Sequence, residues 1–181
     1  MASRDSLGKT REYYRKILPF FEMEAVARRD LRFWRSLARR WHPARILDVG
    51  AGLGRITSAV ARDAPAVGID ISLEMLARTR RGVEPGSRAR FVAADMRRVA
   101  FAGGFDLIIA AGDPFSHLTS SVERRQTLRA VAEQLSGHGH FVLEGLYRRR
   151  ETFERRERRI RHAAGVLSIS ESWQPIGARH L

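Results

Sequence analysis

The hydrophobic positions repeat with a helical period at the start of the chain and group into short runs afterwards. Over residues 10–41 the apolar spacing predicts two amphipathic helices, with Pro19 near their junction. Five apolar runs follow: RILDVG, AVGIDI, ARFVAAD, FDLIIAAG and HFVLEGL. Helix-period segments at 55–62, 73–81 and 122–135 lie between several of these runs. Strands that alternate with helices in this way predict parallel βαβ units.

The apolar runs are nearly continuous, which is typical of strands covered by helices on both faces. We therefore predict an open, doubly wound α/β fold, with a mostly parallel sheet of at least five strands. A length of 181 residues, with 44% hydrophobic and 29% charged residues, indicates one globular domain over residues 1–181.

Roughly 35 residues follow the last apolar run, and their pattern predicts only one helix and one strand. In the arginine-rich segment 147–162, glutamates recur every third residue, and this spacing predicts a basic helix with ion pairs along its surface. The sequence GVLSISESW alternates apolar residues with serine, which predicts one half-exposed strand. It is either a sixth sheet strand or, slightly favoured, the first strand of an insertion. The sheet is thus expected to end after its fifth or sixth strand.

An incomplete sheet leaves one edge strand with unpaired backbone groups. Such an edge can pair with another chain. We therefore expect a homo-oligomer or a partner chain that completes the sheet edge.

The stretch ILDVGAGLGRIT joins the first predicted strand to a helix through Gly50, Gly52 and Gly54. Glycines allow a tight turn and a close approach of a ligand to the backbone. Dinucleotide folds need GxGxxG and phosphate-binding loops need GK[ST], and this stretch has neither. Asp48 precedes the first glycine by two residues, where it would repel a pyrophosphate but could pair with a cationic amino group. The loop therefore favours a positively charged ligand.

Two more acids follow the next two predicted strands. Asp70 could accept hydrogen bonds from both ribose hydroxyls, which NAD and S-adenosylmethionine share. Asp95 could accept from an adenine amino group, with Met96 beside the base, or it could cap a helix. Three acids at three consecutive strand ends are expected to line one edge of the sheet.

In this order, the motifs ILDVGAGLGRIT, VGIDISLEMLARTR, FVAADMRRV and FDLIIAAGDPFSHLTS resemble the class I S-adenosylmethionine-dependent methyltransferases over residues 13–146. The resemblance implies a Rossmann-like fold, S-adenosyl-L-methionine as the cofactor and a cofactor-binding core at 44–146. Members of this class usually finish the sheet with a sixth strand and an antiparallel seventh, so the resemblance also implies that this sheet is truncated after its fifth or sixth strand. It implies that Asp48 and the glycine loop hold the methionine part, Asp70 the ribose, and Asp95 the adenine. The full implied cofactor set is Tyr14, Asp48, Gly50, Ala51, Gly52, Gly54, Asp70, Ile71, Asp95, Met96, Gly112 and His117.

Within this class, GDPFSHLTS is similar to the fourth-strand motif of small-molecule enzymes such as glycine N-methyltransferase and sugar N-methyltransferases. The sequence YYRKILPFFEMEA is similar to their N-terminal lid, so residues 10–41 are expected to form a helical lid in which Tyr14 faces the cofactor. Methyl transfer needs a base only when the acceptor begins protonated. The candidates are His117, as a base or as a packed histidine, and Asp113, as an amine ligand or as a turn before Pro114.

A net charge of +13 suggests nucleic acid as a partner, but 31 of the 33 basic residues are arginines scattered through every segment. The sequence GDPFSH also departs from the [ND]PP[FYW] motif of enzymes that methylate adenine or glutamine amino groups. We therefore predict methylation of a small-molecule N or O acceptor. The alternatives are an RNA or DNA methyltransferase that uses the arginine-rich surface, and a cofactor-binding subunit that is inactive alone.

Other classes of protein have little support. The chain has no cysteine, and its six histidines include no HExxH or HxxxH pair, so no metal site is predicted. No apolar stretch approaches the roughly 18 residues of a membrane span, and Glu22 and Glu24 interrupt the one candidate signal-peptide core. We expect a cytoplasmic protein that does not bind a membrane.

Overall fold

The computed structural model describes residues 3–27, 30–145, 154–162 and 165–173. The chain divides into two compact units. One contains residues 1–18 and 29–145, and the other contains residues 19–28 and 146–181. The unit with the sheet carries the acids and glycines predicted to form a site.

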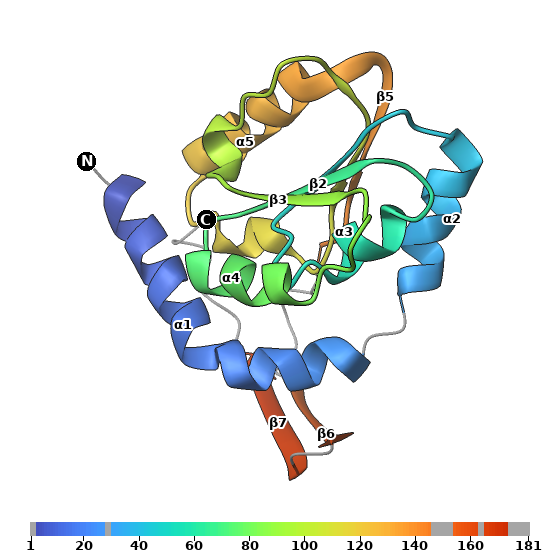
Figure 1. The fold of residues 1–181 in the computed structure, drawn as a ribbon. Coiled ribbons are helices and arrows are strands. Elements are labelled where there is room, and N and C mark those ends of the chain that lie inside the picture. The colour runs from blue at the N-terminus through green and yellow to red at the C-terminus, as the bar shows by residue number, and fades with distance from the viewer. Residues whose placement is uncertain (1–2, 28–29, 146–153, 163–164, 174–181) are drawn as a thin grey trace. The chain divides into compact units, whose positions relative to one another are not determined.

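The sheet unit contains five parallel strands in the order β3-β2-β1-β4-β5 (Figure 1). The strands are β1 (Ile46–Val49), β2 (Ala66–Asp70), β3 (Ala89–Ala93), β4 (Phe105–Ala110) and β5 (Leu135–Leu143). Each overlaps one of the five apolar runs, so the predicted doubly wound α/β sheet is confirmed. Because the strand order reverses beside β1, the carboxyl ends of β1 and β4 flank the switch point where ligands bind in such sheets.

The connecting helices also lie where the periodicity predicts them. They are α3 (Arg55–Val60), α4 (Leu73–Arg81) and α5 (Ser121–Gln134), with short 3-10 helices η1 (Met96–Arg98) and η2 (Pro114–His117) after β3 and β4. Ser120 begins α5 with a capping box, since its side chain accepts from the Glu123 N–H while the Glu123 carboxylate binds the Ser120 N–H.

Helices α1 (Ser3–Ala27) and α2 (Leu31–Trp41) confirm that the N-terminal segment forms two helices. The predicted junction at Pro19 is wrong, because α1 continues through that proline to Ala27. Proline removes one backbone donor and disturbs the preceding turn, but it does not prevent helical dihedrals in the residues that follow. Helix α1 ends at Ala27 among the described residues, and Asp30 is the N-cap residue of α2.

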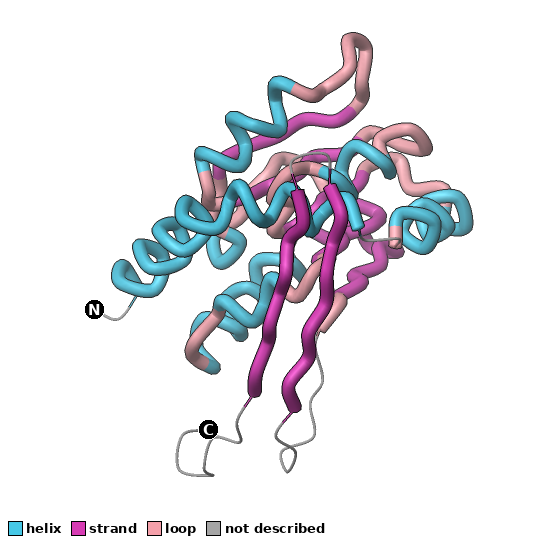
Figure 2. The backbone as a smooth tube through the Cα atoms, turned by 90° about the horizontal axis from the view of Figure 1, so that it is seen from below, coloured by secondary structure: helices cyan, strands magenta, loops and turns pink. Residues whose placement is uncertain are grey.

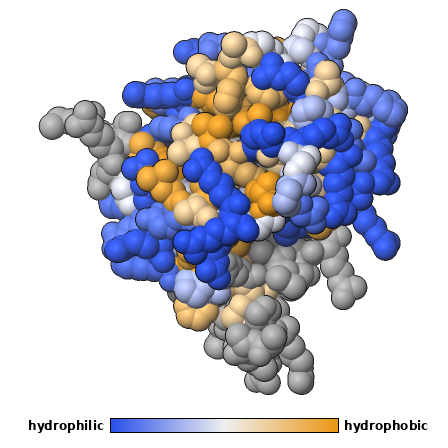
Figure 3. Space-filling model, in the orientation of Figure 1, coloured by the Kyte–Doolittle hydropathy of each residue, from blue (hydrophilic) through white to orange (hydrophobic). Residues whose placement is uncertain are grey.

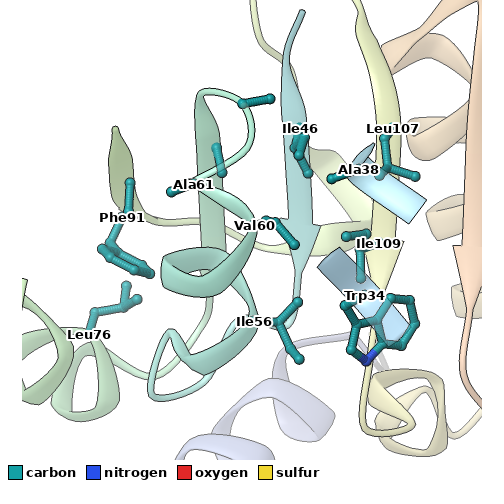
Figure 4. Packing of buried hydrophobic residues seen from close by; sticks show 13 residues of the cluster. Trp34, Ala38, Ile46, Ile56, Val60, Ala61, Leu76, Phe91, Leu107 and Ile109 are labelled. Atoms are coloured by element: carbon teal, nitrogen blue, oxygen red, sulfur yellow. The ribbon is translucent and has the colours of Figure 1, made fainter. Parts of the chain in front are cut away.

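Two hydrophobic clusters cover the two faces of the sheet. On one face, α2, α3 and α4 pack on the strands through Trp34, Ala38, Ile56, Val60 and Leu76 (Figure 4). On the other face, α5 contributes Ala130 and Val131. Successive side chains of a strand point to opposite faces, so Ile46 belongs to the first cluster and Leu47 to the second.

Strand β5 is longer than its apolar run, since it begins at Leu135 rather than at His140. Its pairing with β4 shifts register between Phe105 and Leu107. A side chain at Gly139 would place its Cβ 2.7 Å from the Phe105 carbonyl oxygen. The polar, glycine-containing start of β5 therefore pairs as a strand because glycine lets the two backbones come close.

The second unit contains an antiparallel pair, β6 (Glu154–His162) and β7 (Gly165–Trp173) (Figure 2). The predicted strand GVLSISESW is confirmed, and it is not a sixth strand of the parallel sheet. The predicted basic helix is wrong over 154–162, and its remaining residues, 147–153, lie outside the described ranges. Glutamate–arginine pairs at helical spacing stabilise a helix by only about 0.2–0.5 kcal/mol each, so pairing with β7 outweighs them.

The length and composition of a helix decide whether it could span a membrane. Of the helices that the structure describes, none is both long enough and apolar enough to cross a bilayer.

A comparison of Gly54 with Gly86 distinguishes the cost of backbone strain from the cost of a steric clash. Both have a positive φ, +69° and +80°, but a Cβ at Gly54 would lie 2.6 Å from the Phe91 ring and also meet Thr79, whereas one at Gly86 would meet nothing within 4 Å. We expect Gly86→Ala to cost about 1–2 kcal/mol from φ strain alone. Gly54→Ala should cost about 1–3 kcal/mol more, because the added methyl overpacks the core. Urea unfolding of both variants measures the difference, and equal losses would contradict the packing of this loop.

Candidate functional site

The glycine loop between β1 and α3 is fastened to the carboxyl end of β2. The backbone N–H groups of Gly50 and Ala51 both donate to the Ile69 carbonyl at 2.9 Å. The Gly52 N–H donates to the Asp70 carboxylate at 2.8 Å. Gly50, Gly52 and Gly54 all have positive φ, as the GxGxG spacing requires. The loop and Asp70 therefore form one hydrogen-bonded unit.

Asp70 lies at the end of β2 and is 8% exposed. Its second carboxylate oxygen accepts from the Ser72 N–H at 2.8 Å, just before α4 begins. Burial raises the pKa of Asp70, and the backbone donors of Ser72, Gly52 and Ile71 offset part of that increase. The prediction that Asp70 stands at a strand end beside the loop is met by this geometry, while its ribose contact stays a prediction.

Asp48 lies beneath the loop and is 1% exposed. Its carboxylate accepts from the Thr57 hydroxyl of α3 at 2.6 Å. Burial raises the pKa of Asp48 to about 6; the Thr57 hydrogen bonds oppose this increase, and the nearby Asp70 charge adds to it. Two buried acids thus lie close enough to disfavour each other's ionisation.

Asp95, after β3, has a different environment because it is paired. Its carboxylate accepts from the Arg97 backbone N–H at 3.0 Å and from the Arg97 guanidinium at 2.8 Å. The guanidinium, which is buried, also donates to Glu123 of α5 at 2.5 Å. Burial opposes ionisation of Asp95, but Arg97 outweighs it and lowers the pKa of Asp95. Asp95 is therefore a cap of η1 and part of an ion-pair network, and its predicted adenine contact stays a prediction.

Tyr14 of α1 contacts His117 of η2, and the Tyr14 hydroxyl lies 2.6 Å from His117 Nε2. Their ring centroids are 5.1 Å apart. Burial raises the pKa of Tyr14, with Asp70 adding to the effect. Burial lowers the pKa of His117, against the opposing charges of Asp113 and Asp70. At neutral pH the phenol is thus protonated and the imidazole neutral, which makes Tyr14 the donor when the His117 proton is on Nδ1.

The other predicted residues lie around the same strand ends. Asp113 adopts a left-handed backbone, φ 60°, before Pro114, so it does form the turn that was one of its two alternatives. Gly112 donates its N–H to Glu144 at 2.6 Å. Ile71 is partly exposed, and its carbonyl accepts from Arg11 of α1 at 3.2 Å. Met96 packs against the cluster under α5.

Sequence reasoning missed four residues of this edge: Arg11, Thr57, Ser72 and Glu144. Glu144 directly follows β5, so the rule that picked acids at strand ends would have found it. Thr57 and Ser72 lie within quoted motifs, but a hydroxyl in a helix or cap carries no distinctive signal. Arg11 is one of many arginines, and only the fold brings it to Ile71.

The charges of the site indicate the ligand that it suits. Tyr14 and His117 both sense the charges of Asp70 and Asp113, so these four side chains converge. Among the described residues, no basic side chain forms an ion pair with Asp48, Asp70 or Asp113. Within the same ranges, no group of three or more His, Asp or Glu side chains is arranged to hold a metal ion. The unpaired carboxylates therefore suit an organic ligand that carries positive charge, for example one with a sulfonium and an ammonium group.

The parallel sheet, the glycine loop and the acid at the end of β2 define a Rossmann-like protein that binds an adenosine cofactor. Residues 46–139 match the family model described as a methyltransferase domain. The chain belongs to this methyltransferase family, which uses S-adenosyl-L-methionine. The predicted resemblance to S-adenosylmethionine-dependent methyltransferases is therefore confirmed.

Known proteins support the same fold. YqeM of Bacillus subtilis (strain 168), whose name describes it as a methyltransferase, is 32% identical over 102 residues, which are 55% of this chain and 41% of YqeM. The chain therefore spans about two fifths of that relative. The structure of S-adenosylmethionine-bound CalS10, an amino pentose methyltransferase from Micromonospora echinaspora, has a TM-score of 0.67 at 21% identity over 86% of this chain and 80% of CalS10. The sugar N-methyltransferase KedS8 from a Streptoalloteichus species has a TM-score of 0.60 at 18% identity, over 80% and 70% of the two chains.

Replacing the buried acid Asp48 tests its charge. With a pKa of about 6 when folded and 3.8 as an ordinary carboxyl, Asp48 binds its proton more tightly in the folded protein, so its contribution to stability falls as the pH rises from about 4 to 6. Asp48→Asn keeps an acceptor for Thr57 and should stabilise the protein by about 1–3 kcal/mol at pH above 7, with little change near pH 4. Thermal unfolding at the two pH values measures this.

Asp106→Asn is the matched control for that experiment. The Ser136 hydroxyl and two backbone N–H groups lower the pKa of Asp106 despite partial burial, so its charge contributes to stability at neutral pH and the variant should lose stability there. A destabilised Asp48→Asn protein at neutral pH would contradict the raised pKa of Asp48.

Proposed function

We propose that this chain transfers the methyl group of S-adenosylmethionine to an amine nitrogen of a small molecule, bound at the carboxyl edge beside Tyr14, Asp113 and His117. The observation that carries the proposal is the convergence of a neutral histidine, a tyrosine and two carboxylates without a basic partner. The methyltransferase family match supports the reaction class.

The residues proposed to hold the cofactor are those that the family resemblance implies. Asp48 and the glycine loop would bind its methionine part, Asp70 its ribose, and Asp95 with Met96 its adenine. When bound, S-adenosylmethionine supplies an electrophilic methyl group, and in-line displacement needs mainly alignment of the acceptor. Arg97 fixes the Asp95 carboxylate, and Ser72 and Gly52 fix Asp70, so both acids are held in place before a ligand arrives.

An amine acceptor suits these charges better than a hydroxyl. Most alkyl amines are protonated at neutral pH, and Asp70 and Asp113 would attract that cation. A nitrogen must lose a proton to attack or after it has attacked, and His117, neutral because burial lowers its pKa, can accept it. A hydroxyl acceptor would need a much stronger base. CalS10 and KedS8, by their titles, act on an amino pentose and on a sugar nitrogen, which supports the same acceptor chemistry here.

A nucleic-acid acceptor is not proposed. The net charge of +13 and a predicted basic helix favour it, but residues 154–162 form a strand instead, and net charge alone does not select a methyl acceptor. The substrate, the open-edge partner and the independent activity of the chain remain predictions from the sequence.

Cofactor binding gives the first test. Titration calorimetry should show S-adenosylmethionine binding to the wild-type chain, and Asp70→Ala should weaken it by about 1–3 kcal/mol, because a charge-assisted hydrogen bond is lost. Asp106→Ala, an acid outside the site, serves as the control and should bind as wild type. Transfer of labelled methyl to a panel of amino sugars and simple amines then tests the acceptor class. No binding by the wild-type chain at high micromolar cofactor would overturn the proposal.

The contact between Tyr14 and His117 gives the second test. Tyr14→Phe removes the donor that stabilises the neutral imidazole, so the pKa of His117 should rise and the acid limb of the kcat/KM profile should move to higher pH. The kcat should fall about tenfold, the effect of one hydrogen bond. His117→Gln should lower kcat by about 10²–10⁴-fold.

Tyr13→Phe is the matched control, because Tyr13 is adjacent and half exposed, and it contacts Tyr14 and His117 through its ring, which phenylalanine keeps. It should leave the profile unchanged. If Tyr14→Phe also leaves the acid limb in place, the pair has a packing role only.

A further inference from the structure

A trough on the outer side of α2 and α3 is lined by arginines on both walls. Its cavity volume is about 840 Å³. Helix α2 contributes Arg32, Arg35, Arg39 and Arg40 to one wall, and Arg55 and Arg62 lie on the other. Ser36, Ser58 and Ala59 form a floor of small residues. In Figure 3 the surface over α2 is hydrophilic, and the lining residues include no acid.

Half of these arginines are fixed by acids next to the trough. Asp63 binds Arg35 at 2.8 Å and Arg39 at 3.1 Å, and Asp30 binds Arg55. Among the described residues, Arg32, Arg40 and Arg62 have no acidic partner for their guanidinium groups. These three side chains are exposed. The trough therefore has a rigid set of donors and a free set of three positive charges.

Helix electrostatics explain only part of this arrangement. Arg39 and Arg40 lie in the last turn of α2, where positive charge is favoured by the helix dipole. Arg32 lies in the first turn, where the same dipole disfavours it. Helix stability therefore does not account for the charge of Arg32.

The distribution of charge selects among possible ligands. Arg32, Arg35 and Arg39 follow one another along α2 at about one helical turn, while Arg55 begins α3 and Arg62 lies just beyond its end. This distribution of charge along the trough suits an extended polyanion better than a compact one. Leu31 is the only large apolar side chain of the lining, whereas a protein interface needs a buried apolar or aromatic centre. The described lining has no aromatic side chain on which unpaired bases could stack.

We infer that this arginine trough binds the phosphate backbone of a double-stranded nucleic acid, without reading its sequence. The trough is lined by residues of α2, by residues of α3 and by Arg62, and it contains none of the residues proposed to bind the cofactor or the acceptor. It therefore docks the protein and does not present the methyl acceptor. The inference goes beyond the proposed function and does not depend on it. A second cavity of about 320 Å³ shares Ser58 and Arg62 with the trough, and its lining contains Glu84 as well as Arg88.

The test compares two triple variants that remove the same charge. Arg32→Gln with Arg40→Gln and Arg62→Gln empties the trough of its free charges. Arg81→Gln with Arg125→Gln and Arg129→Gln removes three exposed arginines from α4 and α5. Fluorescence anisotropy with a labelled RNA duplex of about 20 base pairs is measured between about 50 and 200 mM KCl.

Wild type should bind with an affinity that falls steeply with salt. The trough triple should lose at least about tenfold in affinity at low salt, and its slope of log K against log salt should fall by about 2–3, one charge per phosphate. The control triple should change the slope by less than about 1. Arg→Lys replacements at the three trough positions keep the charge and should retain most of the binding.

Several outcomes would overturn the inference. Equal losses in the two triples would assign the binding to net charge. Displacement of the duplex by micromolar tripolyphosphate would indicate a compact anion site, and displacement by polyglutamate at equal charge would indicate an acidic protein partner. Tighter binding of a single strand would contradict backbone recognition of a duplex.

The trough triple also needs a folding control. An unchanged melting temperature and an unchanged affinity for S-adenosylmethionine show that its folding and its cofactor site are intact.

Discussion

The buried carboxylate of Asp70 holds the site together. One of its oxygens accepts from the glycine loop and the other accepts from the residue that caps α4, so the loop, β2 and the start of α4 share one anchor. The same charge acts on Tyr14 and His117 across the site. The backbone donors offset only part of the increase in the pKa of Asp70 that burial causes. A positively charged ligand beside Asp70 would therefore stabilise its ionised form.

The burial of Asp70 has an energetic cost in the absence of a cation. Asp48 and Asp70 disfavour each other's ionisation, and in the described residues neither has a basic partner in an ion pair. Asp95 shows the opposite arrangement, in which Arg97 and Glu123 complete a network and the carboxylate stays ionised. Unpaired acids at one edge and a paired acid beside them divide the site into a part suited to positive charge and a part suited to a neutral base.

The arginines illustrate why composition and position must be separated. Their number raises the net charge throughout the chain, and many are bound to nearby acids or carbonyls, such as Arg88 on the Ala61 and Arg62 carbonyls. The α2–α3 trough differs because three of its lining arginines, Arg32, Arg40 and Arg62, have no acidic partner among the described residues. A site for the cofactor and a surface for a polyanion can therefore coexist on this chain, since they share no lining residue.

The sequence by itself determined the strands, the glycine loop and the acids at the strand ends, because each depends on local periodicity or on a residue's position in a short motif. The tertiary structure decided what depends on distant partners. Tyr14 meets His117 across 103 positions, Arg97 takes Asp95 into a network with Glu123, and segment 154–162 becomes a strand because β7 pairs with it. In each case a long-range contact outweighs a weak local preference, and local pattern carries no record of which distant residue will supply the contact.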